Sequence, residues 1–514
     1  MDVLTALPLH VVLPADAEGP LPAQPAAASP TPRAAQAPVW APSGVQATSP
    51  RATRATTALE DIGILVRVWN GPCPEGTPID TRGIRDEDRR YVLHSWSVQG
   101  TADNLPVARA EGCYFWDTDG NRFLDFSSQL VAANLGHGHP RVVEAIHRQA
   151  ATLAFTAPFH AVEVRSTLAR MVVERTPGPL HKVFFTLGGA EANENAIKIA
   201  RMVTGRHKVL SRYNSYHGAT YGAISLTGDE RRPPVEPGIP GVVHFLDPFC
   251  YRCPFAHTYP GCGMPCVDHL RQVIEYENPS TVAAVIVEPI VGGNGVQVPP
   301  PEYLPALRRI CDDHGILLIC DEVMTGWGRT GAWFASERMG VVPDMITMAK
   351  GITSGYVPLG AVAVSERIAR HFDEHMLWAG LTYSGHPVSC AAGVATIQAY
   401  EEEDLVARAR EMEGPLMANL RALGARHEIV GDVRGMGLFA GLDLVADRGA
   451  RTPLHKARPQ AMAALRRGLR ERGVYVYIRH NNLVIAPPLT ITEAQIGEAV
   501  EAIDGALGEA AAAR

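Results

Sequence analysis

Short apolar runs recur along the middle of the chain, and each one is bounded by polar or turn-forming residues. The runs are four or five residues long and rich in Val, Ile and Leu, which is typical of strands buried on both faces of a sheet. They are Val183–Thr186, Ala283–Val287, Ile316–Cys320, Ile346–Ala349 and Gly360–Val364. We therefore expect a sheet whose strands lie in the interior of the protein.

Segments with helical spacing lie between these runs. Ala192, Ala196 and Ile199 fall on one face of a predicted helix. Glu302–His314 is a second predicted helix, and Gly315 follows it in the position where a left-handed residue commonly ends a helix. Alternation of strands and helices over this length predicts an α/β fold with a mostly parallel sheet covered by helices on both sides.

The start of the chain differs from the rest. Residues 1–50 hold 12 Ala and 10 Pro with few large apolar side chains, a composition that cannot bury enough surface to offset the entropy of ordering. We therefore expect residues 1–80 to form a disordered extension. A plain tail or an early start codon is favoured over a transit peptide, because the prolines oppose the amphipathic helix that such a peptide needs.

The remaining chain divides into three predicted parts. Residues 141–384 carry the strand–helix alternation and form the large domain. Residues 385–514 have longer helices and form a smaller α+β domain, to which the N-terminal segment 81–140 contributes. Within the smaller domain the pattern predicts a short strand around Gly437–Leu442 and a basic helix at Gln460–Arg472.

Composition excludes several classes of protein. The 514-residue chain is 46% hydrophobic and 20% charged, with a formal net charge of −7, as in an ordinary globular protein. No basic block indicates nucleic-acid binding, and no apolar run reaches the roughly 20 residues that span a membrane. The nine cysteines are odd in number and scattered, which fits a reducing cytoplasm better than a disulfide scaffold.

Four polar motifs follow predicted strands, at the edge where open α/β sheets bind ligands. The first motif lies in residues 185–194, where Gly188-Gly189-Ala190 comes just before a helix. Small residues let backbone N–H groups approach a phosphate, and the start of a helix favours negative charge. The second motif is Tyr216-His217-Gly218, whose aromatic ring could stack on a flat cofactor. Alone, each of these two motifs is more often structural.

The third and fourth motifs carry charge. Asp321 follows a buried strand, where a carboxylate is costly without a partner. A protonated pyridine nitrogen is such a partner, and holding it protonated makes the ring an electron sink. Lys350 ends another apolar strand, and a partly desolvated lysine becomes a nucleophile toward carbonyls. Singly, Asp321 could cap a turn and Lys350 could reach solvent; the order of all four motifs favours one shared site.

At these residues the chain resembles the class III aminotransferases of fold type I, which use pyridoxal 5'-phosphate (PLP) and include ω-amino acid, taurine, β-alanine and diamine transaminases. The run Asp-Glu-Val-x-Thr-Gly-x-Gly-Arg-Thr-Gly at 321–331 and the region around Lys350 are the most specific parts. The resemblance extends from about Arg90 to Leu507. It implies a large domain with a mostly parallel seven-stranded sheet between helices, and a smaller α+β domain.

The resemblance also implies a role for each matching residue. Lys350 would hold PLP as a Schiff base and move the proton, and Asp321 would pair with the pyridine nitrogen. Tyr216 would stack on one face of the ring and Val323 would pack on the other. The other implied cofactor-binding residues are Gly189, Ala190, His217, Glu288 and, from the second subunit of a homodimer, Thr382.

Two residues are implied for the substrate. Trp96, in His94-Ser-Trp-Ser, resembles the N-terminal segment that closes the substrate pocket. Gly293 stands where ornithine-type relatives have a gating glutamate, which leaves Arg434 without that acidic partner. Arg434 could then form a bidentate pair with a substrate carboxylate, as in pyruvate-using ω-transaminases, although a structural salt bridge is the alternative. Ala190 departs from the Ser or Thr of many relatives, and backbone N–H groups can still bind the phosphate.

A four-cysteine cluster lies between the predicted strands Val183–Thr186 and Ala283–Val287. Its members are Cys250, Cys253, Cys262 and Cys266. The spacing could bind zinc. Similar inserts in some taurine–pyruvate-like relatives belong to a surface or interface loop, and we assign no metal ligand.

The leading interpretation is a transaminase that takes the amino group of an amine and gives it to a keto acid such as pyruvate. The same fold also hosts aminomutases, racemases and decarboxylases, so the fold alone does not decide the reaction. A PLP-binding protein without catalysis is the third alternative, disfavoured because Lys350, Asp321 and Tyr216 are all present. Arg434 favours exchange with a keto acid, and the sequence does not specify the amine donor.

Overall fold

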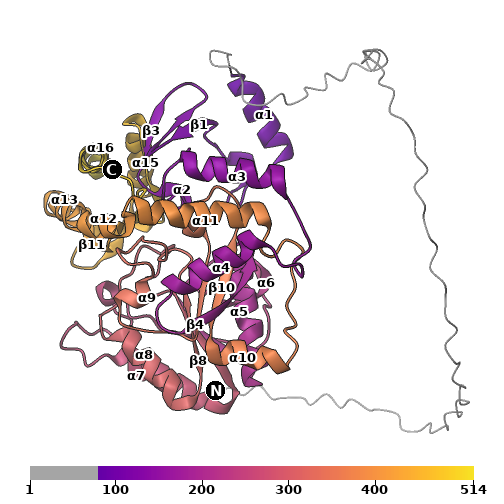
Figure 1. The fold of residues 1–514 in the computed structure, drawn as a ribbon. Helices are drawn as coiled ribbons and strands as arrows, with labels where there is room; N and C mark the ends of the chain where they lie inside the picture. Colours follow the sequence, from indigo (N-terminus) through magenta and orange to yellow (C-terminus); the bar gives the residue numbers. More distant parts are fainter. Residues whose placement is uncertain (1–78, 514) are drawn as a thin grey trace, which may run out of the picture. The chain divides into compact units, whose positions relative to one another are not determined.

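The structure, a computed structural model, describes residues 79–513 (Figure 1). The predicted extension over residues 1–80 therefore falls almost entirely outside the described residues. The described residues lie within one compact unit, Cys73–Arg514. The predicted domain boundaries stay a prediction.

A seven-stranded sheet forms the centre of the fold and confirms the predicted α/β class. Its strands run in the order β4-β10-β9-β8-β7-β5-β6, and β10 alone is antiparallel to its neighbours. The strands are β4 (Leu180–Thr186), β5 (Lys208–Arg212), β6 (Val242–Phe245), β7 (Val282–Val287), β8 (Leu317–Asp321), β9 (Met345–Met348) and β10 (Gly360–Ser365). All five apolar runs are strands, as predicted.

Both faces of this sheet are covered, because successive side chains of a strand point to opposite faces. Ile319 of β8 packs with α5 (Gly189–Thr204) and α10 (Glu366–Glu374). Leu318, the residue before Ile319, packs on the opposite face of the sheet, in a core shared with α4, α7, α8 and α11. These helices are Glu163–Arg175, Pro265–Tyr276, Tyr303–His314 and Pro387–Glu402. Figure 1 shows the strands between the helical layers.

The predicted helix ends are confirmed where glycine sets them. Helix α8 stops at His314, and Gly315 adopts the left-handed conformation with φ 61°. The predicted basic helix is α15 (Pro459–Glu471). The predicted short strand around Gly437–Leu442 is wrong in extent, because Gly437 (φ 64°) turns the chain between β11 (Val430–Met436) and β12 (Phe439–Asp447). Because these two strands contain polar residues, the pattern of apolar positions in the sequence did not predict the hairpin.

Two smaller sheets join the start and the end of the described chain. One sheet has the order β1-β2-β3-β14, where β14 (Val474–Tyr475) pairs in parallel with β3 (Arg122–Asp125). The other has the order β11-β12-β16-β15, and β13 pairs with β12. The other strands of these sheets are β1 (Val107–Glu111), β2 (Tyr114–Asp117), β11 (Val430–Met436), β12 (Phe439–Asp447), β13 (Thr452–Pro453), β15 (Tyr477–Arg479) and β16 (Asn482–Ile485).

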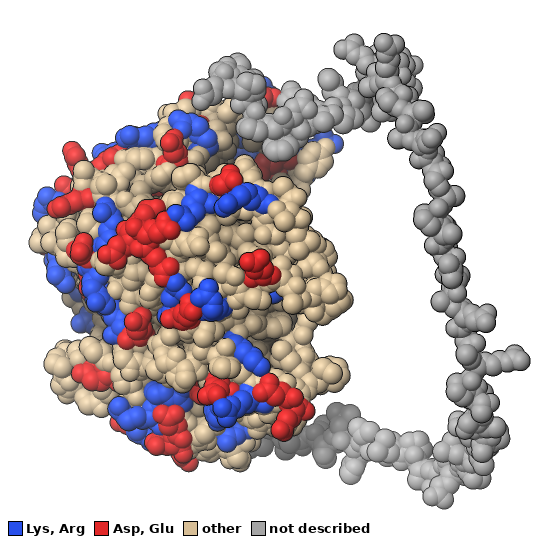
Figure 2. Space-filling view, in the orientation of Figure 1, with Lys and Arg blue, Asp and Glu red and all other residues tan. Residues whose placement is uncertain are grey.

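The remaining helices complete the cover around the three sheets. They are α1 (Thr81–Tyr91), α2 (Ser128–Val131), α3 (Pro140–Thr152), α6 (Tyr221–Leu226), α9 (Ala335–Arg338), α12 (Leu405–Glu411), α13 (Glu413–Arg426), α14 (Leu454–Ala457) and α16 (Glu493–Ala512). Among residues 79–513, no helix combines the length and apolarity that a membrane crossing needs. The predicted cytoplasmic location stays a prediction. Basic and acidic side chains mix over the face in Figure 2.

Candidate active site

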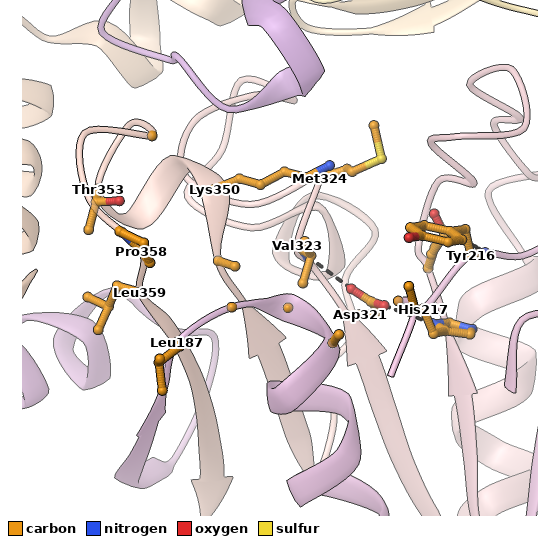
Figure 3. A pocket seen from close by; sticks show the side chains of 18 of the residues that line it. Leu187, Tyr216, His217, Asp321, Val323, Met324, Lys350, Thr353, Pro358 and Leu359 are labelled. Carbon is orange, nitrogen blue, oxygen red and sulfur yellow. Dashed lines mark hydrogen bonds and ion pairs between the residues drawn. The ribbon is translucent and has the colours of Figure 1, made fainter. Parts of the chain in front are cut away.

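A cavity of about 480 Å³ opens at the carboxyl ends of the central strands. Motifs that lie far apart in the sequence meet there, because parallel strands bring their carboxyl ends to one edge of the sheet. Eight of the predicted site residues line it: Gly189, Ala190, Tyr216, His217, Glu288, Asp321, Val323 and Lys350. Figure 3 shows Lys350, Val323, Asp321 and Tyr216 around this space.

The start of α5 forms one wall of the cavity. Its first N–H groups have no partners within the helix, so they are available to a phosphate. An added Cβ at Gly189 would lie 2.8 Å from a methyl carbon of Val323. Gly218, with φ 132°, approaches so closely that an added Cβ would stand 2.5 Å from the Cβ of Ala190. Because neither glycine has a side chain, the backbone of this wall can approach a ligand closely.

Asp321 is buried at the end of β8 and accepts three hydrogen bonds. Its Oδ2 accepts from Asn193 Nδ2 at 2.8 Å and lies 2.7 Å from His217 Nδ1, and its Oδ1 accepts from the backbone N–H of Val323 at 3.1 Å (Figure 3). A carboxylate oxygen has two lone pairs, so Oδ1 keeps one for a further donor. This arrangement suits a pyridinium N–H.

Asn193 is a site residue that sequence reasoning missed. Its side chain is buried, donates to Asp321 and to the carbonyl of His217, and accepts from the hydroxyl of Thr347 at 2.7 Å. It lies one helical turn beyond Gly189, on the face of α5 turned to the sheet. The sequence shows only this helical spacing from Gly189. Because it does not show where Asp321 lies, the spacing alone indicates a core residue.

Lys350 follows β9 and lines the cavity. Its backbone is left-handed with φ 48°, which is uncommon for a residue other than glycine and is typical of strained functional sites. Burial lowers the pKa of its ammonium to about 8, although Asp321 and Glu288 act in the opposite direction. A lysine with this pKa has a larger neutral fraction near physiological pH than an ordinary lysine, and the neutral amine can attack a carbonyl.

Glu288 organises the side of the cavity next to Tyr216. Its carboxylate accepts from the backbone N–H groups of Tyr216 and Gly292, each at 2.9 Å. Burial raises the pKa of the Glu288 carboxyl. Glu288 therefore fixes both the predicted stacking residue and the turn that carries Gly293.

Three predicted residues lie outside the cavity lining. Trp96 is 63% exposed and stands edge-on to Tyr216, with ring centroids 6.3 Å apart. Thr382 is exposed in a loop. Arg434 donates from Nη1 to Asp432 at 2.6 Å and from Nε to the carbonyl of Gly295 at 2.8 Å, while its Nη2 also reaches Gly295. Their predicted roles in binding stay predictions.

The four cysteines between β6 and β7 line a separate small cavity and are free thiols. Burial raises the pKa of the Cys266 thiol to about 11. Among the residues described, no group of three or more His, Cys, Asp and Glu side chains is arranged to hold a metal ion. This cavity shares no lining residue with the one that contains Lys350.

The residues of the main cavity fit PLP. Lys350 provides an amine for its aldehyde, Oδ1 of Asp321 has an acceptor position for its ring nitrogen, and the start of α5 provides N–H groups for its phosphate. Val323 and Tyr216 both line the space that a flat ring would occupy. The individual roles that the resemblance implies for these residues stay predictions.

Comparisons with known proteins agree with this fit. Residues 97–507 match the family model of the class-III aminotransferases. The structure of a taurine:2-oxoglutarate aminotransferase from Bifidobacterium kashiwanohense, in complex with PLP and glutamate, superimposes with a TM-score of 0.79 at 44% identity, covering 83% of this chain and 97% of that one.

The relatives of this chain are named for more than one reaction. A taurine–pyruvate aminotransferase from Rhodobacter capsulatus is 35% identical over 85% of this chain and 99% of its own. A leucine/methionine racemase from Thermococcus litoralis is 37% identical over 79% of this chain and 91% of its own. The family match, the fold and the cavity together establish that this chain belongs to the class III aminotransferases, PLP-dependent enzymes of fold type I.

Proposed function

We propose that this transaminase takes the amino group of an amine or ω-amino acid and transfers it to a keto acid such as pyruvate, in a ping-pong reaction. One observation carries the proposal: Lys350, with a pKa lowered to about 8, shares one cavity with the buried carboxylate of Asp321. An amine that gives and takes a proton and a carboxylate that holds a ring nitrogen are the two groups that amino transfer requires.

PLP, when bound, supplies an aldehyde for the amine and a ring that accepts electrons. The chain's own residues then bind and move protons. Lys350 would hold PLP through its amine and, when that amine is free, would accept and return a proton at Nζ. Asp321 would pair with the ring nitrogen, and Asn193 and His217 hold that carboxylate in place. Tyr216 would stack on one face of the ring and Val323 would pack on the other.

The relatives support an ω-amino acid donor, because two of the three named above act on taurine according to their names. Taurine and β-alanine share a primary amine two carbons from an acid group. The acceptor differs between those two relatives, pyruvate in one and 2-oxoglutarate in the other. We propose pyruvate first, as the sequence indicates, with 2-oxoglutarate as the comparison.

A racemase is the second candidate, favoured by the relative from Thermococcus litoralis. Racemisation and transamination begin with the same proton removal and differ in where the proton returns. In a racemase the amino group stays on the substrate, so a racemase consumes no keto acid. An aminomutase or a decarboxylase of this fold would also leave pyruvate unchanged.

We also propose that the active unit is a homodimer in which Thr382 reaches the partner's cofactor phosphate. Thr382 is exposed and lies outside the cavity of its own chain. Large apolar side chains near it in sequence are exposed as well: Met376 at 66%, Trp378 at 73% and Tyr383 at 53%. Exposed apolar surface of this kind commonly marks an interface.

The test is a pair of half-reactions followed by the visible absorbance of the bound cofactor. Taurine, β-alanine, putrescine or an aryl amine is added alone, and pyruvate or 2-oxoglutarate follows. We expect at least one donor to remove the absorbance band and one keto acid to restore it. A band that never changes with any donor, or chiral inversion of an amino acid without a keto acid, would contradict the proposal.

A further inference from the structure

We propose that Arg231, in the segment after α6, binds the acid group of the substrate, a carboxylate or a sulfonate. This inference rests on the proposed function, because it assigns the residue that selects ω-amino acids and keto acids. Arg231 was not among the residues that the sequence indicated. Its place beside Tyr216 became visible only in the folded chain.

Arg231 lies next to the side of the cavity formed by Tyr216. Its guanidinium carbon is 3.8 Å from the centre of the Tyr216 ring and 5.7 Å from the ring of Trp96. Nη2 lies 3.9 Å from the place that a Cβ on Gly293 would take, and Cβ of Tyr216 is equally close to it. Arg231 therefore lies beside Tyr216, which lines the cavity, and near Gly293; Arg231 itself is not a lining residue.

The hydrogen bonds of Arg231 orient it and leave one nitrogen for a ligand. Nε donates to both oxygens of Asp229, at 3.0 and 3.1 Å, and Nη2 donates to Asp229 as well. Nη2 also reaches the side-chain oxygen of Asn294 at 3.5 Å. Nη1 has no acceptor among residues 79–513, and it is not one of the unpaired polar atoms that the protein encloses. Nη1 is therefore the nitrogen that an anion would bind.

Two guanidinium groups and two carboxylates make up the charges around Arg231. Asp229 balances one positive charge, but Arg479 lies within 3.5 Å of the same carboxylate, so two guanidinium groups share it. Glu230, the other nearby acid, is largely exposed and pairs with Arg479 and His480. Arg231 also acts on the reaction centre, because its positive charge is one of the causes that lower the pKa of Lys350.

Arg434, the residue that the sequence indicated for this role, already donates hydrogen bonds from all three of its nitrogens, and one hydrogen of Nη1 is left over. Its three nitrogens donate to Asp432, to Asn482 and to the carbonyls of Gly295 and Val296. Its side chain is 10% exposed and that of Arg231 is 9% exposed, so the contrast between the two residues lies in their hydrogen bonds. To form a bidentate pair with a substrate carboxylate, Arg434 would have to give up at least one of these partners, whereas Nη1 of Arg231 gives up none.

The test compares Arg231→Met with Arg232→Met in the PLP-bound enzyme. Arg232 is the neighbouring arginine and pairs with Glu236, so the control removes the same chemical group at an adjacent position. Propionate and ethanesulfonate are titrated by calorimetry as unreactive carboxylate and sulfonate probes, with propionamide as the uncharged analogue. The rates of β-alanine, taurine and propylamine in the first half-reaction are measured in the same preparations.

We expect Arg231→Met to weaken binding of at least one acid by about tenfold or more, because a hydrogen bond to a charged group is lost. The rate with the corresponding acidic donor should fall in parallel, and propylamine should react as in the control. Retention of the affinity for both acids, or no measurable affinity for either acid in the unaltered enzyme, would overturn the proposal. The acid that loses affinity tells a carboxylate site from a sulfonate site.

Gly293→Glu provides a second variant in case Arg231→Met fails to fold. The backbone at Gly293 is not left-handed, so a side chain is tolerated, and its carboxylate would lie beside Nη2 of Arg231. We expect the same selective loss of acid binding. Unaltered acid binding in Gly293→Glu would count against Arg231. If instead the unaltered enzyme moves no amino group while Arg231→Met still loses acid affinity, the proposed function fails and the anion site stands.

Discussion

The carboxylate of Asp321 lies 2.7 Å from Nδ1 of His217, and both side chains are buried. An ionised carboxylate only accepts hydrogen bonds, so Nδ1 of His217 is the donor. In a neutral imidazole with its hydrogen on Nδ1, Nε2 accepts from the hydroxyl of Ser211, 3.1 Å away. Through this chain of contacts Ser211 fixes the ring of His217, and His217 fixes the oxygen of Asp321 that Asn193 also contacts.

Replacing Asp321 with Asn tests this arrangement. The amide would present an NH2 group to a place where Asn193, His217 and the N–H of Val323 all donate. It also has no negative charge to keep the ring nitrogen protonated. We expect the variant to retain PLP and to lose activity by on the order of 100-fold, as when other preorganised electrostatic groups are removed. Near-normal turnover with full cofactor content would reduce Asp321 to a turn residue.

The lowered pKa of Lys350 predicts a pH dependence in the cofactor-free enzyme. Only the neutral amine attacks an acylating reagent, so labelling should rise as the pH passes through about 8 and level off above it. In denaturant the same lysine should need a pH near its ordinary value of 10.5. Mass spectrometry of the Lys350 peptide measures both curves. Coincident midpoints for the folded and unfolded protein would show that burial does not act on Lys350.

The contact between Gly189 and Val323 predicts a specific steric effect. An added Cβ at Gly189 would lie 2.8 Å from Val323, so Gly189→Ala must displace that side chain into the space for the cofactor ring. We expect the apparent Kd for PLP to rise about tenfold, measured by fluorescence titration of the cofactor-free protein. Val323→Ala in the same chain should restore much of the affinity. An unchanged Kd in Gly189→Ala would show that the added methyl group fits between residue 189 and Val323 without affecting the cofactor.

Arg434→Met separates the two candidate acid-binding residues. Because Arg434 holds Asp432, Asn482 and the carbonyl of Gly295, we expect its loss to lower the melting temperature and to slow acidic and uncharged donors alike. Melting curves and the two half-reactions measure this. If Arg434→Met instead raises KM for pyruvate strongly and spares propylamine, the role that the sequence indicated for Arg434 is correct and Arg231 is the structural residue.

The sequence predicts the parts of the site that follow from strand order. Asp321 and Lys350 come directly after apolar strands, and the carboxyl ends of parallel strands meet at one edge, so their meeting could be predicted. Arg231 could not, because it lies in a segment without strand or helix periodicity, placed by its pairing with Asp229. Likewise, no local pattern shows that the carbonyl of Gly295, 139 residues away, takes the donors of Arg434.

Transfer of isotope from donor to acceptor tests the central claim most directly. The purified PLP enzyme is incubated with ¹⁵N-labelled β-alanine or taurine and unlabelled pyruvate, and the products are analysed by mass spectrometry. Amino transfer through Lys350 predicts ¹⁵N-labelled alanine in the unaltered enzyme and none in Lys350→Ala. Label that stays in the donor or appears only as ammonium, or labelled alanine formed equally well by Lys350→Ala, would contradict the account.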